Sequence, residues 1–151
     1  MKSTEKSMMQ IRNKIIGQNA CIGEQDLRDL EREYHFKFPE DIQQFYLQYN
    51  GGELEKYAYA AQNDTFIFQS FYSIKAGHST LNEKLRLNYV DDWWPKELVP
   101  FGYDGGGNSF CFDINDGHIY YLYEDDSDDD GNVPREYLAP DFLTFINSMV
   151  E

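Results

Sequence analysis

The chain has 151 residues, and its 27 acidic and 13 basic side chains give it a formal net charge of −14. This length corresponds to one ordinary domain, and the charge argues against nucleic acid or an anionic membrane as a partner, because both require a positively charged surface. Two cysteines, Cys21 and Cys111, are too few for a disulfide framework. No apolar run approaches the ~20 residues that span a bilayer. We therefore expect a soluble, cytoplasmic protein with free thiols.

Three helices are expected in the first third of the chain. Residues 4–17 are predicted to form an amphipathic helix from apolar residues at helical spacing: Met8, Ile11 and Ile15. A second helix is expected from about Glu24. A third begins at Pro39, which suits the first helical position, and ends at Asn50-Gly51-Gly52, which can supply a left-handed terminal residue. Its apolar stripe recurs at i, i+3, i+4 and i+7: Ile42, Phe45, Tyr46 and Tyr49.

After Gly52 the pattern changes to short segments. Residues 57–60 and 66–68 are strand-like and are separated by Gln62-Asn63-Asp64, which favours a hairpin. A further helix capped by Ser79-Thr80 is indicated by three apolar residues: Leu81, Leu85 and Tyr89.

A glycine-rich turn joins two expected strands, residues 98–102 and 109–113. Gly105-Gly106-Gly107 lies between Asp104 and Asn108, whose short polar side chains can hydrogen-bond neighbouring backbone N–H groups. A phosphate-binding loop would need a Lys and then a Ser or Thr opening a helix. Here no cation follows and the chain enters a strand, so we interpret the loop as a structural turn.

The remaining elements complete one α+β domain over residues 1–151. Asn115-Asp116-Gly117 is a turn signal before a strand at residues 118–123. Pro140 then opens a last helix with four apolar residues on one face: Phe142, Phe145, Ile146 and Met149. The prediction is N-terminal helices, a central, largely antiparallel sheet of about five or six strands, and a C-terminal helix.

The acidic loop from Glu124 to Asp130 resembles the start of a calcium loop. Asp126-Ser127-Asp128-Asp129-Asp130-Gly131 has oxygens at positions 1, 3 and 5 and glycine at position 6, as in an EF-hand. The twelfth position, which needs a bidentate Glu, is Tyr137. A solvated acidic loop is the favoured interpretation, with weak calcium binding left open, and no metal or other cofactor is expected.

Catalysis is not expected either. The three histidines, His35, His78 and His118, have no motif spacing to Ser109, Cys111 or a carboxylate. A nucleophile or acid–base pair requires such an orienting partner. The sequence therefore predicts a protein that is not an enzyme.

Two glycine-containing signatures resemble the SUKH superfamily, which includes fungal cell-wall-assembly regulators and many bacterial proteins. The first runs from Phe38-Pro39 to Asn50-Gly51-Gly52, with Phe38 where leucine is usual. The second contains Gly102, Asp104, Gly105, Gly106 and Asp113. With the element order, the resemblance spans about residues 20–149.

The resemblance implies a non-catalytic α+β domain. For bacterial members it implies an immunity protein that neutralises a cognate toxin, often a nuclease. For fungal members it implies a regulatory module of cell-wall assembly. A compact chain favours the bacterial function, and the regulatory interaction module is the alternative. The oligomeric state is left open.

A nuclease toxin carries a cationic surface, so an inhibitor gains association rate from negative charge and affinity from exposed aromatic anchors. Trp93 and Trp94 follow Asp91 and Asp92, and one of the two rings is expected to be buried and the other partly exposed. A second candidate patch combines acidic and aromatic residues: Glu53, Glu55, Tyr57 and Tyr59. The other candidates lie in the acidic loop: Glu124, Asp125, Asp126, Asp128, Asp129 and Asp130.

Overall fold

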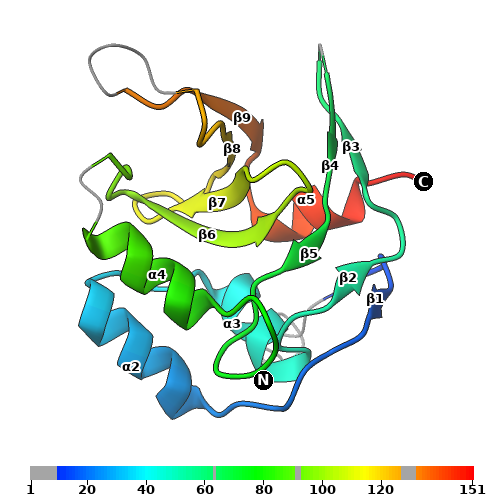
Figure 1. Ribbon diagram of the computed structural model, residues 1–151. Coiled ribbons are helices and arrows are strands. Elements are labelled where there is room, and N and C mark those ends of the chain that lie inside the picture. The colour runs from blue at the N-terminus through cyan, green and yellow to red at the C-terminus, as the bar shows by residue number, and fades with distance from the viewer. Residues whose placement is uncertain (1–9, 63, 91–92, 127–131) are drawn as a thin grey trace.

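The computed structural model describes residues 10–62, 64–90, 93–126 and 132–151. The elements in chain order are β1 (Ile15–Ile16), α2 (Glu24–Tyr34), α3 (Glu40–Gln48), β2 (Glu53–Leu54), β3 (Ala58–Ala60), β4 (Thr65–Ile67), β5 (Ser70–Phe71), α4 (Leu81–Val90), β6 (Leu98–Tyr103), β7 (Ser109–Asp113), β8 (Ile119–Leu122), β9 (Arg135–Ala139) and α5 (Phe142–Asn147). The main sheet has five strands in the order β5-β6-β7-β8-β9, and all neighbours are antiparallel (Figure 1). The expected α+β architecture with a closing helix is confirmed.

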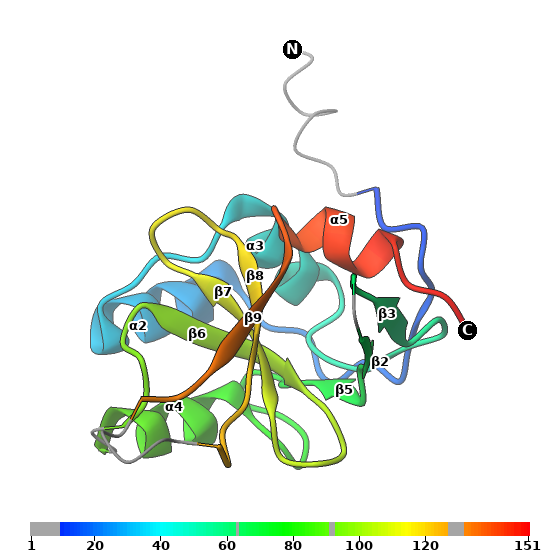
Figure 2. The same ribbon diagram turned by 90° about the horizontal axis from the view of Figure 1, so that it is seen from above.

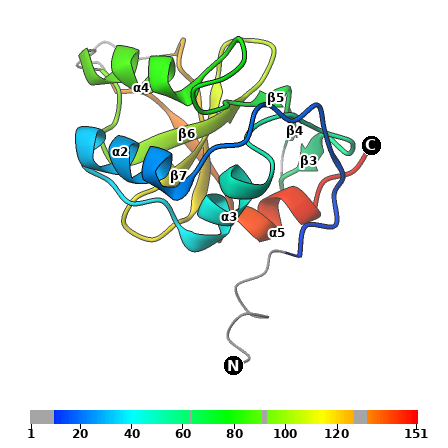
Figure 3. The same ribbon diagram turned by 90° about the horizontal axis from the view of Figure 1, so that it is seen from below.

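Helices cover one face of this sheet. Seen from above, the sheet lies in front of α3 and α5 (Figure 2), and seen from below these helices lie in front of it (Figure 3). β7 runs through the middle, and its side chains alternate as predicted. Phe110 and Phe112 join the large core beneath the sheet, whereas Cys111 packs with Trp94 and Leu98 on the opposite face. Both faces of the central strand are therefore buried.

The core is built from aromatic rings. The ring of Phe45 lies 4.2 Å from that of Phe71 and 5.5 Å from that of Phe142, measured between centroids. Phe145 of the same closing helix lies 5.5 Å from Phe110. Edge-to-face and tilted pairs of this kind stabilise beyond their buried area. They fasten α3 and α5 to the sheet.

A close approach explains the glycine in the second signature. Gly102 lies in β6 next to a register shift relative to β7, and a Cβ there would collide with the buried ring of Phe68. The backbone of β6 and this ring therefore pack without a side chain between them. The φ of Gly102 lies outside the left-handed region that favours glycine. Glycine is therefore required at this position by the close packing and not by the backbone conformation.

Most predicted helices are present, with small shifts at their ends. Thr80 caps α4 by accepting a hydrogen bond from the backbone N–H of Glu83 at 3.2 Å. Asp141 caps α5 by accepting from Thr144 at 2.7 Å. Pro39 stands just before α3 rather than at its first position, and α5 ends at Asn147, so Met149 is buried beyond the helix.

The helix predicted over residues 4–17 is wrong for the part that the structure describes. Residues 1–9 lie outside the described residues, and from residue 10 onward the chain is extended and contains β1. The Asn13 side chain donates to the carbonyls of Lys56 and Ile146 at 2.7 and 2.9 Å and accepts from the Lys56 N–H at 3.0 Å. Tertiary contacts thus override the local helical spacing.

The hairpin predicted at residues 57–68 is confirmed as β3 and β4, and it forms a small sheet separate from the main one. It stands beside the main sheet in Figure 1. The C-terminus extends it, because Ala58 and Val150 exchange two backbone hydrogen bonds of 2.9 and 2.8 Å. Two strands of the main sheet, β5 and β9, were not predicted. Within the described residues, no helix is long and apolar enough to cross a bilayer.

Candidate partner-binding surface

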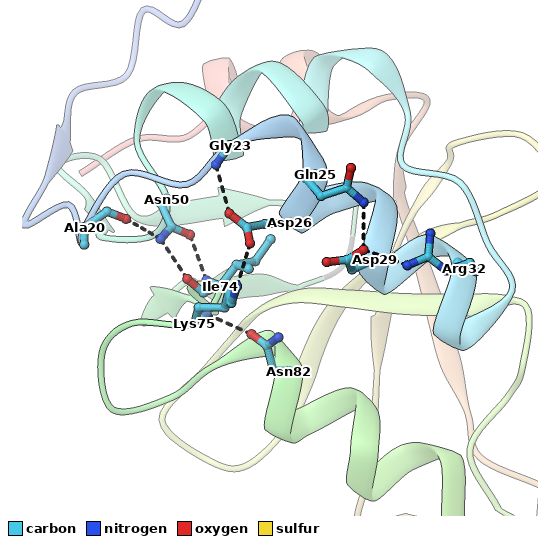
Figure 4. Close-up of polar contacts among 10 residues, drawn as sticks. All are labelled: Ala20, Gly23, Gln25, Asp26, Asp29, Arg32, Asn50, Ile74, Lys75 and Asn82. Atoms are coloured by element: carbon cyan, nitrogen blue, oxygen red, sulfur yellow. Dashed lines mark hydrogen bonds and ion pairs between the residues drawn. The ribbon is translucent and has the colours of Figure 1, made fainter.

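The first signature forms a buried polar joint. Asn50 is fully buried, and its Nδ2 donates to the carbonyls of Ala20 at 2.7 Å and Ile74 at 3.0 Å (Figure 4). Its Oδ1 accepts from the Ile74 N–H at 2.7 Å. Asn50 has a left-handed φ of 49°, and Gly51 and Gly52 continue with φ of 108° and 104°. The joint therefore connects the end of α3 to the segments that precede α2 and α4.

An ion pair closes the same region from outside. Lys75, next to Ile74, places its Nζ 2.7 Å from Oδ1 of Asp26 near the start of α2 (Figure 4). The hydrogen bond from Lys75 lowers the pKa of the Asp26 carboxyl. Asp29 is held similarly by Gln25 and Arg32, which also lower its pKa. Asp26 and Asp29 thus have partners within the chain. Fewer carboxylates of α2 are therefore available to a partner protein than the composition of the helix indicates.

The second signature is a self-contained turn. Asp104 Oδ1 accepts from the backbone N–H groups of Gly106 and Asn108, both at 2.9 Å, and its Oδ2 accepts from the Tyr121 hydroxyl. Burial acts to raise the pKa of Asp104, but these hydrogen bonds outweigh it and the pKa is lowered. The carboxylate occupies the N–H groups that a phosphate would need, which agrees with the interpretation as a structural turn. Among the three consecutive glycines only Gly107 has a positive φ, of 94°.

The start of the acidic loop is also engaged inside the protein. Glu124 has a side chain only 9% exposed and lies 3.0 Å from Lys84 Nζ. It also accepts a hydrogen bond from the Ser109 hydroxyl. Asp125 and Asp126 are exposed, whereas Asp128, Asp129 and Asp130 lie outside the described residues. Glu124 thus anchors the loop to α4, and only the residues after it remain candidates for partner contact.

The two tryptophans are arranged as expected. Trp94 is 3% exposed and donates from Nε1 to the carbonyl of Leu98 at 2.8 Å. Trp93 is half-buried, with its ring 5.6 Å from that of Trp94. Asp91 and Asp92 lie outside the described residues. Trp94 is therefore a core residue, and Trp93 is the one of the pair that retains accessible surface.

Three exposed apolar side chains belong to the hairpin and the C-terminal segment that pairs with it, and we name them together the hairpin face: Tyr57, Ile67 and Val150. Ala58 pairs with Ile67 on one side and with Val150 on the other. Directly paired residues project to the same face of a sheet, so these two side chains flank Ala58. Tyr57 and Ile67 are each 46% exposed and Val150 is 52% exposed. Exposed apolar side chains concentrated on one small element are candidates for an interaction surface.

Tyr59 packs against the core. Its hydroxyl donates to the Leu138 carbonyl at 2.5 Å and its ring lies 4.9 Å from that of Phe145. Burial raises the pKa of this hydroxyl. Tyr59 therefore fastens the hairpin to β9 and α5, and of the two tyrosines predicted for this patch only Tyr57 belongs to the hairpin face.

Acidic residues lie before the hairpin and at its turn. Glu53 and Glu55 precede the hairpin and Asp64 lies at its turn, and all three are exposed. Among the described residues, none of the three forms an ion pair, whereas Asp26 and Glu124 do. One exposed cation, Lys56, lies between Glu55 and Tyr57. Of the second candidate patch, Glu53, Glu55 and Tyr57 are thus exposed, whereas Tyr59 is partly buried.

Sequence reasoning missed Ile67 and Val150. The signal for Ile67 was present, because Phe66 and Phe68 alternate with it and both are buried. An apolar residue on the outward side of an alternating strand has no core to enter. Val150 follows the last helix, and nothing in its sequence surroundings predicts a pairing with Ala58.

No group of three or more His, Cys, Asp or Glu residues is placed to hold a metal ion in the part of the chain that the structure describes. The histidines lie apart. His35 ends α2 with a left-handed φ of 62°, His78 is exposed in a loop, and His118 lies 3.4 Å from Asp116.

Comparison with known proteins agrees with the two signatures. A model of the SMI1 / KNR4 family (SUKH-1) matches residues 21–148, which contain both signatures. The SPbeta prophage-derived uncharacterized protein YokK of Bacillus subtilis (strain 168) is 23% identical over 146 residues. That match covers 84% of this chain and 74% of YokK.

Proposed function

This chain belongs to the SMI1 / KNR4 family (SUKH-1), as its two glycine signatures predicted, and we propose that it is an immunity protein that binds and neutralises a cognate nuclease toxin. It acts in the cytoplasm by occlusion: it covers the surface of the toxin and carries out no reaction itself. The partner is a basic protein domain.

The hairpin face is the observation that carries this proposal. Three exposed apolar side chains lie on the hairpin and the segment paired with it, and exposed carboxylates without an ion-pair partner among the described residues flank them in the chain. Protein interfaces combine an apolar centre that excludes water with a polar rim. In this chain the rim is mainly negative, which complements the positive surface that a nuclease needs to hold phosphates. The same surface would repel nucleic acid.

Rescue of cells tests the function. The toxin encoded beside this gene is expressed in cells with and without this chain, and surviving colonies are counted. The expected result is survival only when both proteins are present. If the chain gives no protection, but binds a regulatory protein of its own host, the alternative of a regulatory interaction module replaces the immunity function.

Binding to a catalytically inactive form of that toxin tests the surface. Tyr57→Ala combined with Ile67→Ala should raise Kd about 30-fold or more, because exposed anchors at the centre of an interface dominate affinity. Leu87→Ala is the control, since Leu87 is 44% exposed and belongs to α4, a helix remote from the hairpin (Figures 1 and 2). It should leave Kd within about threefold. Equal losses in the two variants, or none in the hairpin variant, would rule out the hairpin face as the binding surface.

A further inference from the structure

A cavity of about 490 Å³ opens on a part of the molecule that the proposed function does not use. It lies between the end of α2, α4 and the start of β6. Figures 1 and 3 show α2 and α4 side by side there. Its volume falls within the range of small-molecule sites, about 300–1,000 Å³. The cavity is thus large enough for an organic ligand.

The walls are mainly aromatic and aliphatic. Rings come from Tyr34, Phe36 and Tyr89, and branched side chains come from Val99 and Ile114. Tyr34 and Tyr89 meet edge to face with centroids 5.3 Å apart, so the rings are held by each other as well as by the core. Flat apolar molecules are the ligands that such walls favour.

One buried polar group in this wall has no partner. Asn88 of α4 is 4% exposed, and its Nδ2 makes no hydrogen bond within the described structure. An unpaired buried donor is costly, and native proteins rarely keep one without a reason. Because the two ends of a carboxamide have nearly the same shape, the amide can turn to present Nδ2 to a ligand acceptor in the cavity.

The cavity wall contains one cation. Its lining includes Lys96 and, within the described residues, no carboxylate. Lys96 Nζ donates to the backbone carbonyl of Asn88 at 3.3 Å and lies 5.7 Å from the ring centroid of Tyr89. An ammonium group therefore contacts the backbone of the residue whose side-chain amide is unpaired.

We propose that this cavity binds a small aromatic carboxylate, with the ring between the side chains of Tyr34, Phe36 and Ile114 and the carboxylate at Asn88 and Lys96. The amide Nδ2 donates to one carboxylate oxygen, and the ammonium group neutralises the charge. The site shares no residue with the hairpin face, so ligand binding does not depend on toxin binding.

The test uses 2-naphthoate as the probe and 2-naphthamide as its uncharged counterpart, both titrated into the full chain by calorimetry. The protein should bind 2-naphthoate with Kd below about 1 mM and 2-naphthamide more weakly. Ile114→Trp, which fills the cavity, should abolish binding of both. Lys96→Gln should weaken binding of the carboxylate and leave that of the amide nearly unchanged, whereas Lys56→Gln, a distant exposed lysine, should change neither.

Asn88→Leu separates binding from folding. Removing an unpaired buried polar group should leave the thermal midpoint at or above that of the unmodified protein, while affinity for 2-naphthoate falls about tenfold or more. Absence of 2-naphthoate binding at about 1 mM, equal affinity for the two probes, or unchanged binding in Ile114→Trp would each overturn the proposal. Toxin protection by Ile114→Trp should persist, so failure of this site and failure of the immunity function are distinguishable.

Discussion

Asn50 illustrates how one side chain can organise a fold. It satisfies two carbonyls and one N–H from segments far apart in sequence and adopts a left-handed φ. Asn50→Gly keeps that backbone conformation but removes the hydrogen bonds, so the free energy of unfolding should fall by about 3 kcal/mol. Asn50→Ala should lose about 1 kcal/mol more, since alanine resists this φ. Urea unfolding measures both, and equal losses would contradict the backbone contribution.

Asp104 should make stability depend on pH. Its pKa in the folded protein is lowered, so its contribution is present above the unfolded pKa of about 3.9 and is lost as the pH falls through the folded value. Asp104→Asn should therefore be less stable than the unmodified protein at pH 7, with a difference that shrinks below about pH 4. Urea midpoints at a series of pH values measure this, with the exposed Glu33→Gln as control. A constant difference down to pH 2 would contradict the assignment.

At the scale of elements, α4 is tied to the acidic loop by one charge pair. Lys84 and Glu124 are 3.0 Å apart, with side chains 18% and 9% exposed, and Lys84 also lies 5.0 Å from the Trp94 ring centroid. Lys84→Met leaves Glu124 buried without its cation and should lower the free energy of unfolding by about 3 kcal/mol. Arg86→Met breaks the exposed pair with Glu83 on the same helix and should change stability little. Similar effects in these two variants would contradict the role of burial.

Elements with a complete local pattern could be predicted from the sequence. The stripe of α3, the cap of α4 and the alternation of β7 all agree with the structure. β9 was not predicted, because its first three residues are all exposed and show no alternation of polar and apolar side chains: Arg135, Glu136 and Tyr137. The false N-terminal helix has the opposite cause: its spacing is helical, but Asn13 bonds to Lys56 and the end of α5. Pairing partners distant in sequence decided both cases.

For the candidate surface too, local patterns could be predicted from the sequence and contacts between distant segments could not. The sequence identified the acidic and aromatic composition of the patch around Tyr57, because these residues are neighbours along the chain. It could not predict that Tyr59 hydrogen-bonds to Leu138 or that Glu124 forms an ion pair with Lys84. It also could not predict that Val150 joins Ala58. Each of these depends on the relative placement of the hairpin, β9 and the C-terminus, which local spacing does not encode.

At the scale of the whole molecule, a net charge of −14 should govern how fast a basic toxin arrives, and the hairpin face should govern how long it stays. Long-range attraction raises the association rate and is screened by salt, whereas close apolar contacts set the dissociation rate. Asp128→Asn, Asp129→Asn and Asp130→Asn together remove three charges from the acidic loop. This variant should associate several-fold more slowly in low salt and dissociate at the normal rate.

Tyr57→Ala with Ile67→Ala should give the reverse, a normal association rate and faster dissociation. Stopped-flow mixing with the inactive toxin measures both rates. In about 1 M salt, where screening acts within about 3 Å, the charge variant should match the unmodified protein while the hairpin variant keeps its defect. If removing the three charges changed neither rate in low salt, the acidic loop would play no part in steering the toxin, and the attraction would have to come from the carboxylates around the hairpin.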